Sequence, residues 1–158
     1  MTFAVYLIAN AAAALYVLAI RKRRIQSLEV LAYWLLSIIL VQNYSAIFYM
    51  NTRFTDIPDI LSFEGADLVN RLVLYPLAIV LILDLCTACR TMTGKAGTVL
   101  AGVCVLTGLE WIDDRTGIHV HRSWAFWWSP AIWLLILLVA LGFMAYFRRK
   151  LLGGIRRA

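Results

Sequence analysis

The sequence predicts an all-α, polytopic membrane protein built as a bundle of five transmembrane helices. The chain of 158 residues is 63% hydrophobic and 15% charged, whereas a soluble domain usually carries about 25% charged residues. Its apolar residues stand in runs long enough to cross a bilayer. No soluble segment, low-complexity tract or internal repeat separates these runs. Residues 1–158 are therefore expected to form a single transmembrane helical domain.

The first two spans are expected at about residues 2–20 and 28–49. No basic residue precedes the first apolar run, and the basic residues 21–24 follow it directly. That order is typical of a stop-transfer segment rather than of a cleaved signal peptide, so the first helix is expected to be retained. The second span carries two polar residues, Gln42 and Asn43, in its later half.

The other three spans are expected at about residues 67–87, 95–112 and 124–147. Pro76 lies inside the third span and can kink it, because proline removes one backbone hydrogen bond of a helix. A short link joins the third span to the fourth, and a basic cluster at residues 148–150 follows the fifth.

The basic residues predict that the N-terminus lies outside and the C-terminus in the cytoplasm. Positive charge gathers on the cytoplasmic side of membrane proteins. In this orientation 11 of the 15 basic residues are inside, and seven of the nine acids are outside. The inner basic residues are Arg21, Lys22, Arg23, Arg24, Arg90, Lys95, Arg148, Arg149, Lys150, Arg156 and Arg157; the outer ones are Arg53, Arg71, Arg115 and Arg122. We therefore expect a multi-pass protein of the cell membrane.

Small residues form a stripe on the fourth span, at Gly97, Ala101, Cys104 and Gly108. Their spacing of 4, 3 and 4 keeps them on one helical face. Small residues let membrane helices approach closely, so we expect this stripe to be the buried face of the helix. Packing within the monomer is preferred over dimerisation.

Tryptophan is concentrated between the fourth and fifth spans. Residues 107–130 hold four of the six tryptophans and both histidines. Trp124, Trp127 and Trp128 share one helical face at the outer boundary. We interpret them as an aromatic belt at the lipid headgroups, with the wall of a ligand site as the alternative.

Carboxylates on the fourth span are the strongest functional indication. Glu110, Asp113 and Asp114 are spaced i, i+3, i+4 and would share one face if the helix continues that far. Counted from Lys95, Glu110 lies about 22 Å along the helix, short of a hydrocarbon core of about 30 Å. A carboxyl at that depth normally faces protein or water.

The third span brings Asn70 and Arg71 to the same side of the membrane, with Tyr75 one turn deeper. Because neighbouring helices joined by a short link pack antiparallel, Arg71 is expected to pair with Glu110, or failing that with Asp114. We interpret this set as an outward-facing pocket; a polar network that only fixes helix register, or a catalytic site, are the alternatives. The candidate ligand-binding residues are Arg71, Glu110, Asp113, Asp114, His121, Asn70, Tyr75, Trp124 and Trp127.

Two further motifs have chemically active residues at weakly specific spacings. His119 and His121 form a His-x-His with ligand types that suit zinc or copper, but two histidines on an outer loop are usually solvated. Cys86 and Cys89 form a C-x-x-C, which redox proteins normally place in a βαβ context. We expect neither a metal nor a cofactor.

Three stretches of this chain occur together in one group of membrane proteins. They are Val73-Leu74-Tyr75-Pro76, Glu110-Trp111-Ile112, and residues 121–129 with Trp124 and Trp127-Trp128-Ser129. In this combination the chain resembles an uncharacterised family of small integral membrane proteins of spore-forming Gram-positive bacteria. The family pattern has a second histidine where this chain has Arg122, so the resemblance implies Glu110 and His121 as the pair of interest. It implies a fold and a site but no reaction.

The favoured interpretation is a non-enzymatic protein whose outer pocket binds a small polar ligand or a lipid headgroup, or which is a subunit of a membrane assembly. One alternative is a membrane enzyme with a Glu110–His121 acid–base pair, with or without the assistance of a metal. Another is a cytoplasmic-face thiol redox protein that uses Cys86 and Cys89. The expected partners are the bilayer, the ligand, and further copies or another membrane subunit. The net charge of +6 does not indicate nucleic acid, because the basic residues form no common face.

Overall fold

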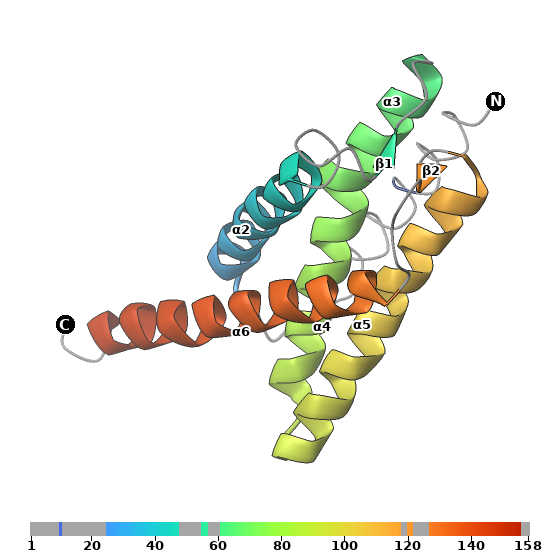
Figure 1. The fold of residues 1–158 in the computed structure, drawn as a ribbon. Coiled ribbons are helices and arrows are strands. Elements are labelled where there is room, and N and C mark those ends of the chain that lie inside the picture. The colour runs from blue at the N-terminus through green and yellow to red at the C-terminus, as the bar shows by residue number, and fades with distance from the viewer. Residues whose placement is uncertain are drawn as a thin grey trace.

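The computed structural model describes residues 10, 25–47, 55–56, 61–117, 120–121 and 127–155. These residues are almost entirely helical (Figure 1). The elements are α2 (Ser27–Ser45), β1 (Thr55–Asp56), α3 (Leu61–Val69), the π-helix η2 (Asn70–Leu74), α4 (Tyr75–Ala88), α5 (Met92–Arg115), β2 (Val120–His121) and α6 (Trp128–Ile155). The two-residue strands pair antiparallel, with Thr55 opposite His121.

Four helices are long and apolar enough to cross a membrane: Ser27–Ser45, Glu64–Ala88, Met92–Arg115 and Trp128–Lys150. Their mean hydropathy lies between 1.3 and 2.3. The chain therefore has the composition of a multi-pass membrane protein. The first predicted helix, at residues 2–20, lies outside the described residues except for Asn10, which is helical and buried.

The third span is one continuous rod made of α3, η2 and α4 (Figure 1). Its π turn is closed by the backbone N–H of Tyr75, the residue that follows η2, which donates to the carbonyl of Asn70. Pro76 follows in the first turn of α4 and has no N–H for the carbonyl four residues earlier, which belongs to Leu72. The Trp34 indole Nε1 donates to that carbonyl at 3.1 Å. The proline thus leaves an acceptor that links α2 to the third span.

The α4–α5 hairpin is tight at its turn and at mid-height. The Thr91 hydroxyl accepts from the Gly94 backbone N–H at 3.1 Å and so caps α5. Further along, a Cβ added to Gly102 would meet Ile82 Cδ1 at 2.8 Å. A larger residue at this position would force the Ile82 side chain to move, so Gly102 favours the close approach of α4 and α5.

The predicted buried stripe of α5 is wrong. Gly97, Ala101 and Cys104 are exposed and Gly108 is only partly buried, while a Cβ added to Gly97 or Gly108 would meet nothing within 4 Å. The buried face of α5 is instead made of Val99, Gly102, Val103, Leu106, Glu110 and Asp113. A single small residue, Gly102, is sufficient for the contact with α4, and large apolar side chains fill the rest of that face.

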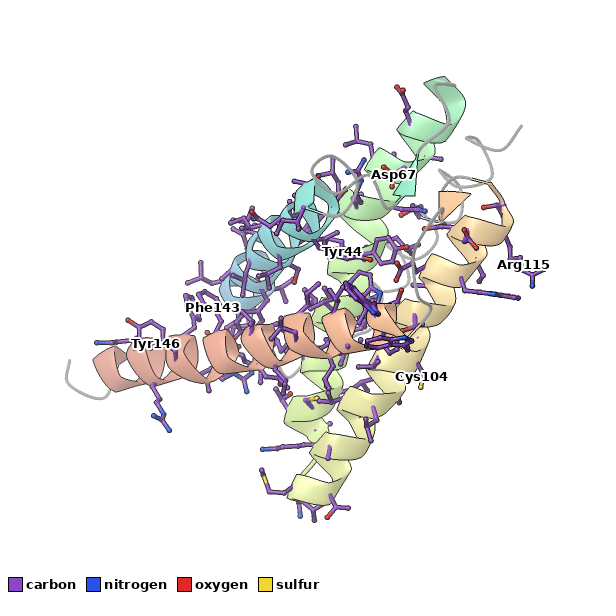
Figure 2. All side chains as sticks on the ribbon, viewed as in Figure 1. Tyr44, Asp67, Cys104, Arg115, Phe143 and Tyr146 are labelled. Carbon is purple, nitrogen blue, oxygen red and sulfur yellow. The ribbon has the colours of Figure 1, made fainter. Side chains whose placement is uncertain are left out.

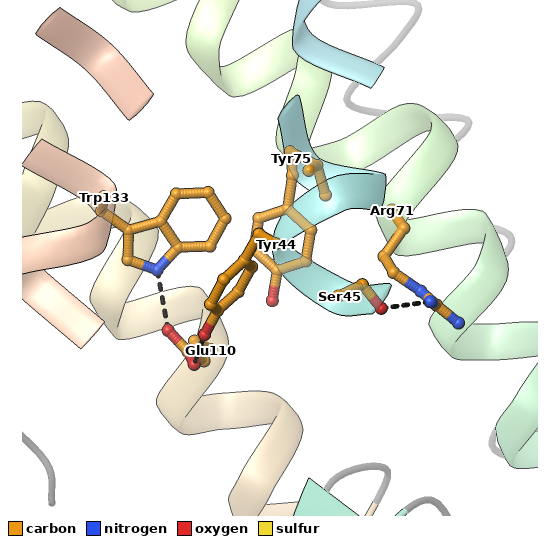
Figure 3. A pocket seen from close by; sticks show the side chains of 7 residues that line it. Tyr44, Ser45, Arg71, Tyr75, Glu110 and Trp133 are labelled. Carbon is orange, nitrogen blue, oxygen red and sulfur yellow. Dashed lines mark hydrogen bonds between the residues drawn. The ribbon is translucent and has the colours of Figure 1, made fainter. Parts of the chain in front are cut away.

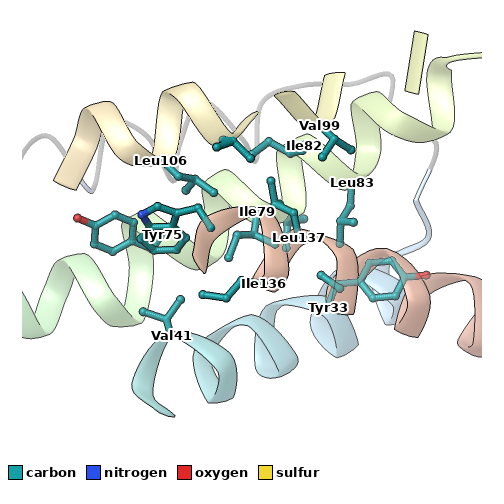
Figure 4. Close-up of a cluster of buried hydrophobic side chains, with 14 of the residues drawn as sticks. Tyr33, Val41, Tyr75, Ile79, Ile82, Leu83, Val99, Leu106, Ile136 and Leu137 are labelled. Carbon is teal, nitrogen blue, oxygen red and sulfur yellow. The ribbon is translucent and has the colours of Figure 1, made fainter. Parts of the chain in front are cut away.

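The apolar core surrounds α4, which contacts α2, α5 and α6. Its fully buried side chains include Ile79 and Leu83 from α4, Tyr33 from α2 and Leu137 from α6 (Figure 4). In Figure 1, α6 crosses in front of α4 and α5 and reaches toward the start of α2. This crossing brings residues of α6 to polar groups at both ends of the core.

Candidate functional site

Glu110 is the centre of a polar cluster near the end of α5. Its side chain is buried, at 3% exposure. The Tyr44 hydroxyl donates to Oε1 at 2.8 Å, and the Trp133 indole Nε1 donates to Oε2 at 2.7 Å (Figure 3). One carboxylate of α5 therefore joins α2 to α6. Hydrogen bonds to a charged acceptor are stronger than those between two neutral groups.

Asp113, one turn further along α5, binds the third span. Its carboxylate accepts from Asn70 Nδ2 at 3.0 and 3.2 Å and from the Tyr75 hydroxyl at 2.6 Å. Asn10 Nδ2 in turn donates to Asn70 Oδ1 at 2.8 Å. A π turn closes its hydrogen bond between residues i and i+5, which brings Asn70 and Tyr75 to the same face of the rod. The irregular turn thus explains how both side chains reach one carboxylate.

Arg71 does not pair with Glu110, so this prediction is wrong. Its guanidinium forms an ion pair with Asp67, one turn earlier on the same helix, and donates to the Ser45 hydroxyl (Figure 3). Asp67 is fully buried, and a carboxylate at i−4 is nearer to Arg71 than one on another helix. Because Tyr44 and Trp133 already donate to Glu110, the carboxylate is held without the arginine.

A small cavity separates Arg71 from Glu110. Its volume is about 10 Å³, which is the scale of one water molecule. Three aromatic rings form part of its wall: Trp133 stacks on Tyr75 with centroids 5.1 Å apart and meets Tyr44 edge-on at 5.6 Å. The lining residues are Val41, Tyr44, Ser45, Arg71, Tyr75, Glu110 and Trp133.

The structure gathers most of the predicted site residues and leaves others apart. Asn70, Arg71, Tyr75, Glu110 and Asp113 all belong to the cluster or its cavity. Asp114 is half-buried beside them. Trp127, by contrast, is 68% exposed and meets Trp128 edge-on at 5.6 Å. Trp124, His119 and the side chain of His121 lie outside the described residues.

Sequence reasoning missed Tyr44, Ser45 and Trp133 as members of the site. Their apolar surroundings made them look like ordinary core or belt residues. A usable signal existed, because buried polar groups need hydrogen-bond partners. A carboxylate in an apolar helix therefore predicts tyrosine, tryptophan or serine donors at the same depth on neighbouring helices.

A second buried carboxylate was also missed, at the opposite end of α2. Glu29 is 4% exposed, and Arg148 of α6 donates to it from Nε at 2.7 Å and from Nη2 at 3.3 Å. The Tyr33 hydroxyl adds a contact of 3.0 Å. Glu29 also accepts from the Gln26 backbone N–H at 2.9 Å, which caps α2.

The cysteines are free thiols, and the described histidine, cysteine and acidic side chains show no assembled metal centre. Cys86 is a buried free thiol, and Cys89 is a half-buried one with its Sγ 3.3 Å from the Thr98 hydroxyl. Within the described ranges, no group of three or more histidine, cysteine, aspartate or glutamate side chains is arranged to hold a metal ion. Whether Cys86 and Cys89 act together remains a prediction.

No protein-family model, curated protein or solved structure matches this chain. The resemblance based on the Tyr-Pro, Glu-Trp and tryptophan motifs therefore stays a prediction. Two of those motifs have a clear structural place: Tyr75-Pro76 follows the π turn, and Glu110 binds the two aromatic donors.

Proposed function

We propose that this chain is a non-enzymatic, multi-pass membrane protein whose outer polar site binds a small cation. The observation that carries the proposal is the Glu110 carboxylate, which is buried and yet lines a cavity. Its two described donors, Tyr44 and Trp133, fix the orientation of both carboxylate oxygens. A fixed carboxylate in a water-poor region attracts a cation more strongly than one in water.

The charges around the cavity favour a cation over an anion. Among the described residues of the cluster, Asp67, Glu110 and Asp113 are buried acids and Arg71 is the basic group. The ion pair with Asp67 offsets the charge of Arg71.

The size of the cavity limits the ligand. A space of about 10 Å³ holds a particle the size of a water molecule. Ammonium and alkali cations meet this limit, whereas a lipid headgroup would have to displace Tyr44 or Arg71. Binding rather than catalysis is favoured because the described neighbours of Glu110 are donors that hold it in place, and not a nucleophile poised for reaction.

Thermal unfolding in detergent tests the proposal with ammonium, sodium, potassium and choline chlorides at one ionic strength. We expect a saturable rise in Tm with one of the three small cations and none with choline, which is too large. At a hundredfold excess over Kd the gain is about 2.7 kcal/mol, or roughly 5–10 °C. Glu110→Gln should abolish the rise, while Glu64→Gln, at an exposed position of α3, should keep it. Equal Tm values in all four salts would contradict cation binding at this site.

We also propose the five-helix arrangement with the N-terminus outside and the C-terminus in the cytoplasm. It is supported by the four described spans, by the apolar residues 2–20 and by the excess of basic residues on the inner segments. In this orientation the Glu110 cluster lies toward the outside, and the Glu29–Arg148 pair lies toward the cytoplasm.

Cysteine labelling in intact cells tests the orientation. Thr116 is exposed just after α5, so Thr116→Cys should react with an impermeant maleimide. A cysteine placed after Leu152, as in Gly153→Cys, should react only after the cells are opened. The parent chain with its three native cysteines supplies the background. The opposite labelling pattern would reverse every side assignment made above.

A further inference from the structure

A second hollow lies on the lipid-facing side of α5, apart from the polar cavity. Its volume is about 460 Å³, within the range of about 300–1,000 Å³ that is usual for small-molecule sites. The lining residues are Val103, Cys104, Thr107, Gly108, Trp111 and Pro130. Five of them belong to α5, and Pro130 belongs to the first turn of α6. From Val103 to Trp111 the groove follows α5 for about 12 Å.

The exposed small residues create this groove. A Cβ added to Gly108 would meet no atom within 4 Å, and Cys104 is exposed on the same side. Figure 2 shows Cys104 and Arg115 pointing away from the bundle along one edge of α5. Since α5 is long and apolar enough to cross a membrane, we expect Cys104, near the middle of this helix, to face hydrocarbon.

One end of the groove carries a positive charge. The Arg115 guanidinium lies over the Trp111 ring, 4.8 Å from its centroid, and Trp111 lines the groove. A cation–π contact of this kind holds an exposed guanidinium in place. The first turn of α6 adds the positive end of a helix dipole near Pro130. Arginine also recognises phosphate oxygens through paired hydrogen bonds.

We propose that this groove binds an anionic phospholipid, with one acyl chain along α5 and the phosphate at Arg115. Apolar walls followed by a cation at the level of Trp111 match the order of chain and headgroup in a lipid. Trp127 and Trp128 are both exposed at the start of α6, as is usual for aromatic residues at the headgroup level. The site lies in the leaflet that contains Arg115, whichever side of the cell that is.

A second copy of the chain is the competing occupant, because small residues on an exposed helix face also favour helix pairing. The positive charge of Arg115 favours an anionic lipid over a second copy of the chain. In a symmetric pair whose α5 helices run parallel, two Arg115 side chains would meet and repel each other, whereas a phosphate would attract the guanidinium. Lipid binding here does not depend on the cation site at Glu110, so either can fail without the other.

Native mass spectrometry of the full chain in mild detergent tests the site, with phosphatidylglycerol and phosphatidylcholine of identical acyl chains. Wild type should bind phosphatidylglycerol about tenfold more tightly than phosphatidylcholine, because one charge-assisted contact contributes about that much affinity. Arg115→Gln should remove this preference, whereas Lys95→Gln, an exposed cation at the other end of α5, should keep it. Gly108→Leu should fill the groove and weaken the binding of both lipids about tenfold or more.

Gly97→Leu is the matched control, because it is the same substitution on the same helix, also in open space, and Gly97 does not line the groove. It should bind both lipids as wild type does. Equal lipid binding by the two leucine variants would overturn the proposal. So would a wild-type dimer that Gly108→Leu splits while lipid binding is unchanged, since the groove would then hold a second copy. A Tm within a few degrees of wild type verifies that each variant is folded.

Discussion

Replacing Glu110 by alanine should lower the free energy of unfolding in detergent by about 3–5 kcal/mol. The substitution removes the acceptor from two buried donors, Tyr44 and Trp133, which come from two other helices. Each donor left without an acceptor costs about 1–3 kcal/mol, and the lost side-chain volume adds a cavity term. The measurement is the Tm followed by near-ultraviolet circular dichroism, which reports the loss of fixed aromatic packing around Trp133.

Two variants make this result interpretable. Glu110→Gln keeps an acceptor oxygen and nearly the same volume, so its loss should be clearly smaller than that of Glu110→Ala. Glu64→Ala removes a carboxylate from an exposed position in α3 and should stay close to wild type. If Glu110→Ala unfolded at the temperature of Glu64→Ala, the two aromatic contacts would have no energetic role, and Glu110 would not organise the cluster.

The apolar runs allow the four described spans to be predicted, because length and hydropathy decide whether a helix can cross a bilayer. The residues at which the helices begin and end were less predictable. α5 continues to Arg115, beyond the expected residue 112, since Glu110 and Asp113 point into the protein and are satisfied there. The rod of α3, η2 and α4 begins well before the expected residue 67. Helix ends depend on such local partners, which a hydropathy profile does not contain.

Helical periodicity predicted the members of the site on α5 and the third span, but it predicted neither their pairing nor the members on α2 and α6. Spacing placed Glu110 and Asp113 on one face of α5, and both are buried there. The π turn was not visible in the sequence, and it determines that Asn70 and Tyr75 reach Asp113 together. The partner of Arg71 was predicted from its height along the helix. Height alone could not distinguish Asp67, on the same helix, from Glu110 on the neighbouring helix.

The exposed stripe of α5 shows a limit of pattern reasoning in membranes. Small residues at spacings of 4, 3 and 4 are typical of a packed face, but lipid is as apolar as a neighbouring helix, so hydrophobicity cannot tell which face is covered. Among the described glycines of α5, Gly102, which was not part of the stripe, is the one whose added Cβ would come closer than 3.0 Å to another atom. Likewise, Glu29 and Arg148 are 119 residues apart, and their pairing depends on how α6 crosses α2.

Replacing Arg148 by methionine should lower the free energy of unfolding by about 2–4 kcal/mol. The variant leaves the buried Glu29 carboxylate without the guanidinium that binds both of its oxygens. The side chain of Arg148 is 27% exposed and that of Glu29 is 5% exposed, so water screens the pair only in part. Arg149→Met, at the exposed neighbouring position, removes the same charge from the same helix and should have little effect.

A double-mutant cycle separates the pair from the individual side chains. Glu29→Gln keeps one acceptor oxygen, which can still accept from the Gln26 backbone N–H and so preserve the cap of α2, while its amide N–H can donate to the Tyr33 hydroxyl oxygen in place of the bond that Tyr33 donates in the wild type. We expect the double variant Glu29→Gln with Arg148→Met to lose about 1–3 kcal/mol less than the two single losses together. The reason is that a lone buried charge is the most costly state, and the double variant contains none. Strictly additive losses would mean that the two charges do not stabilise the contact between α2 and α6.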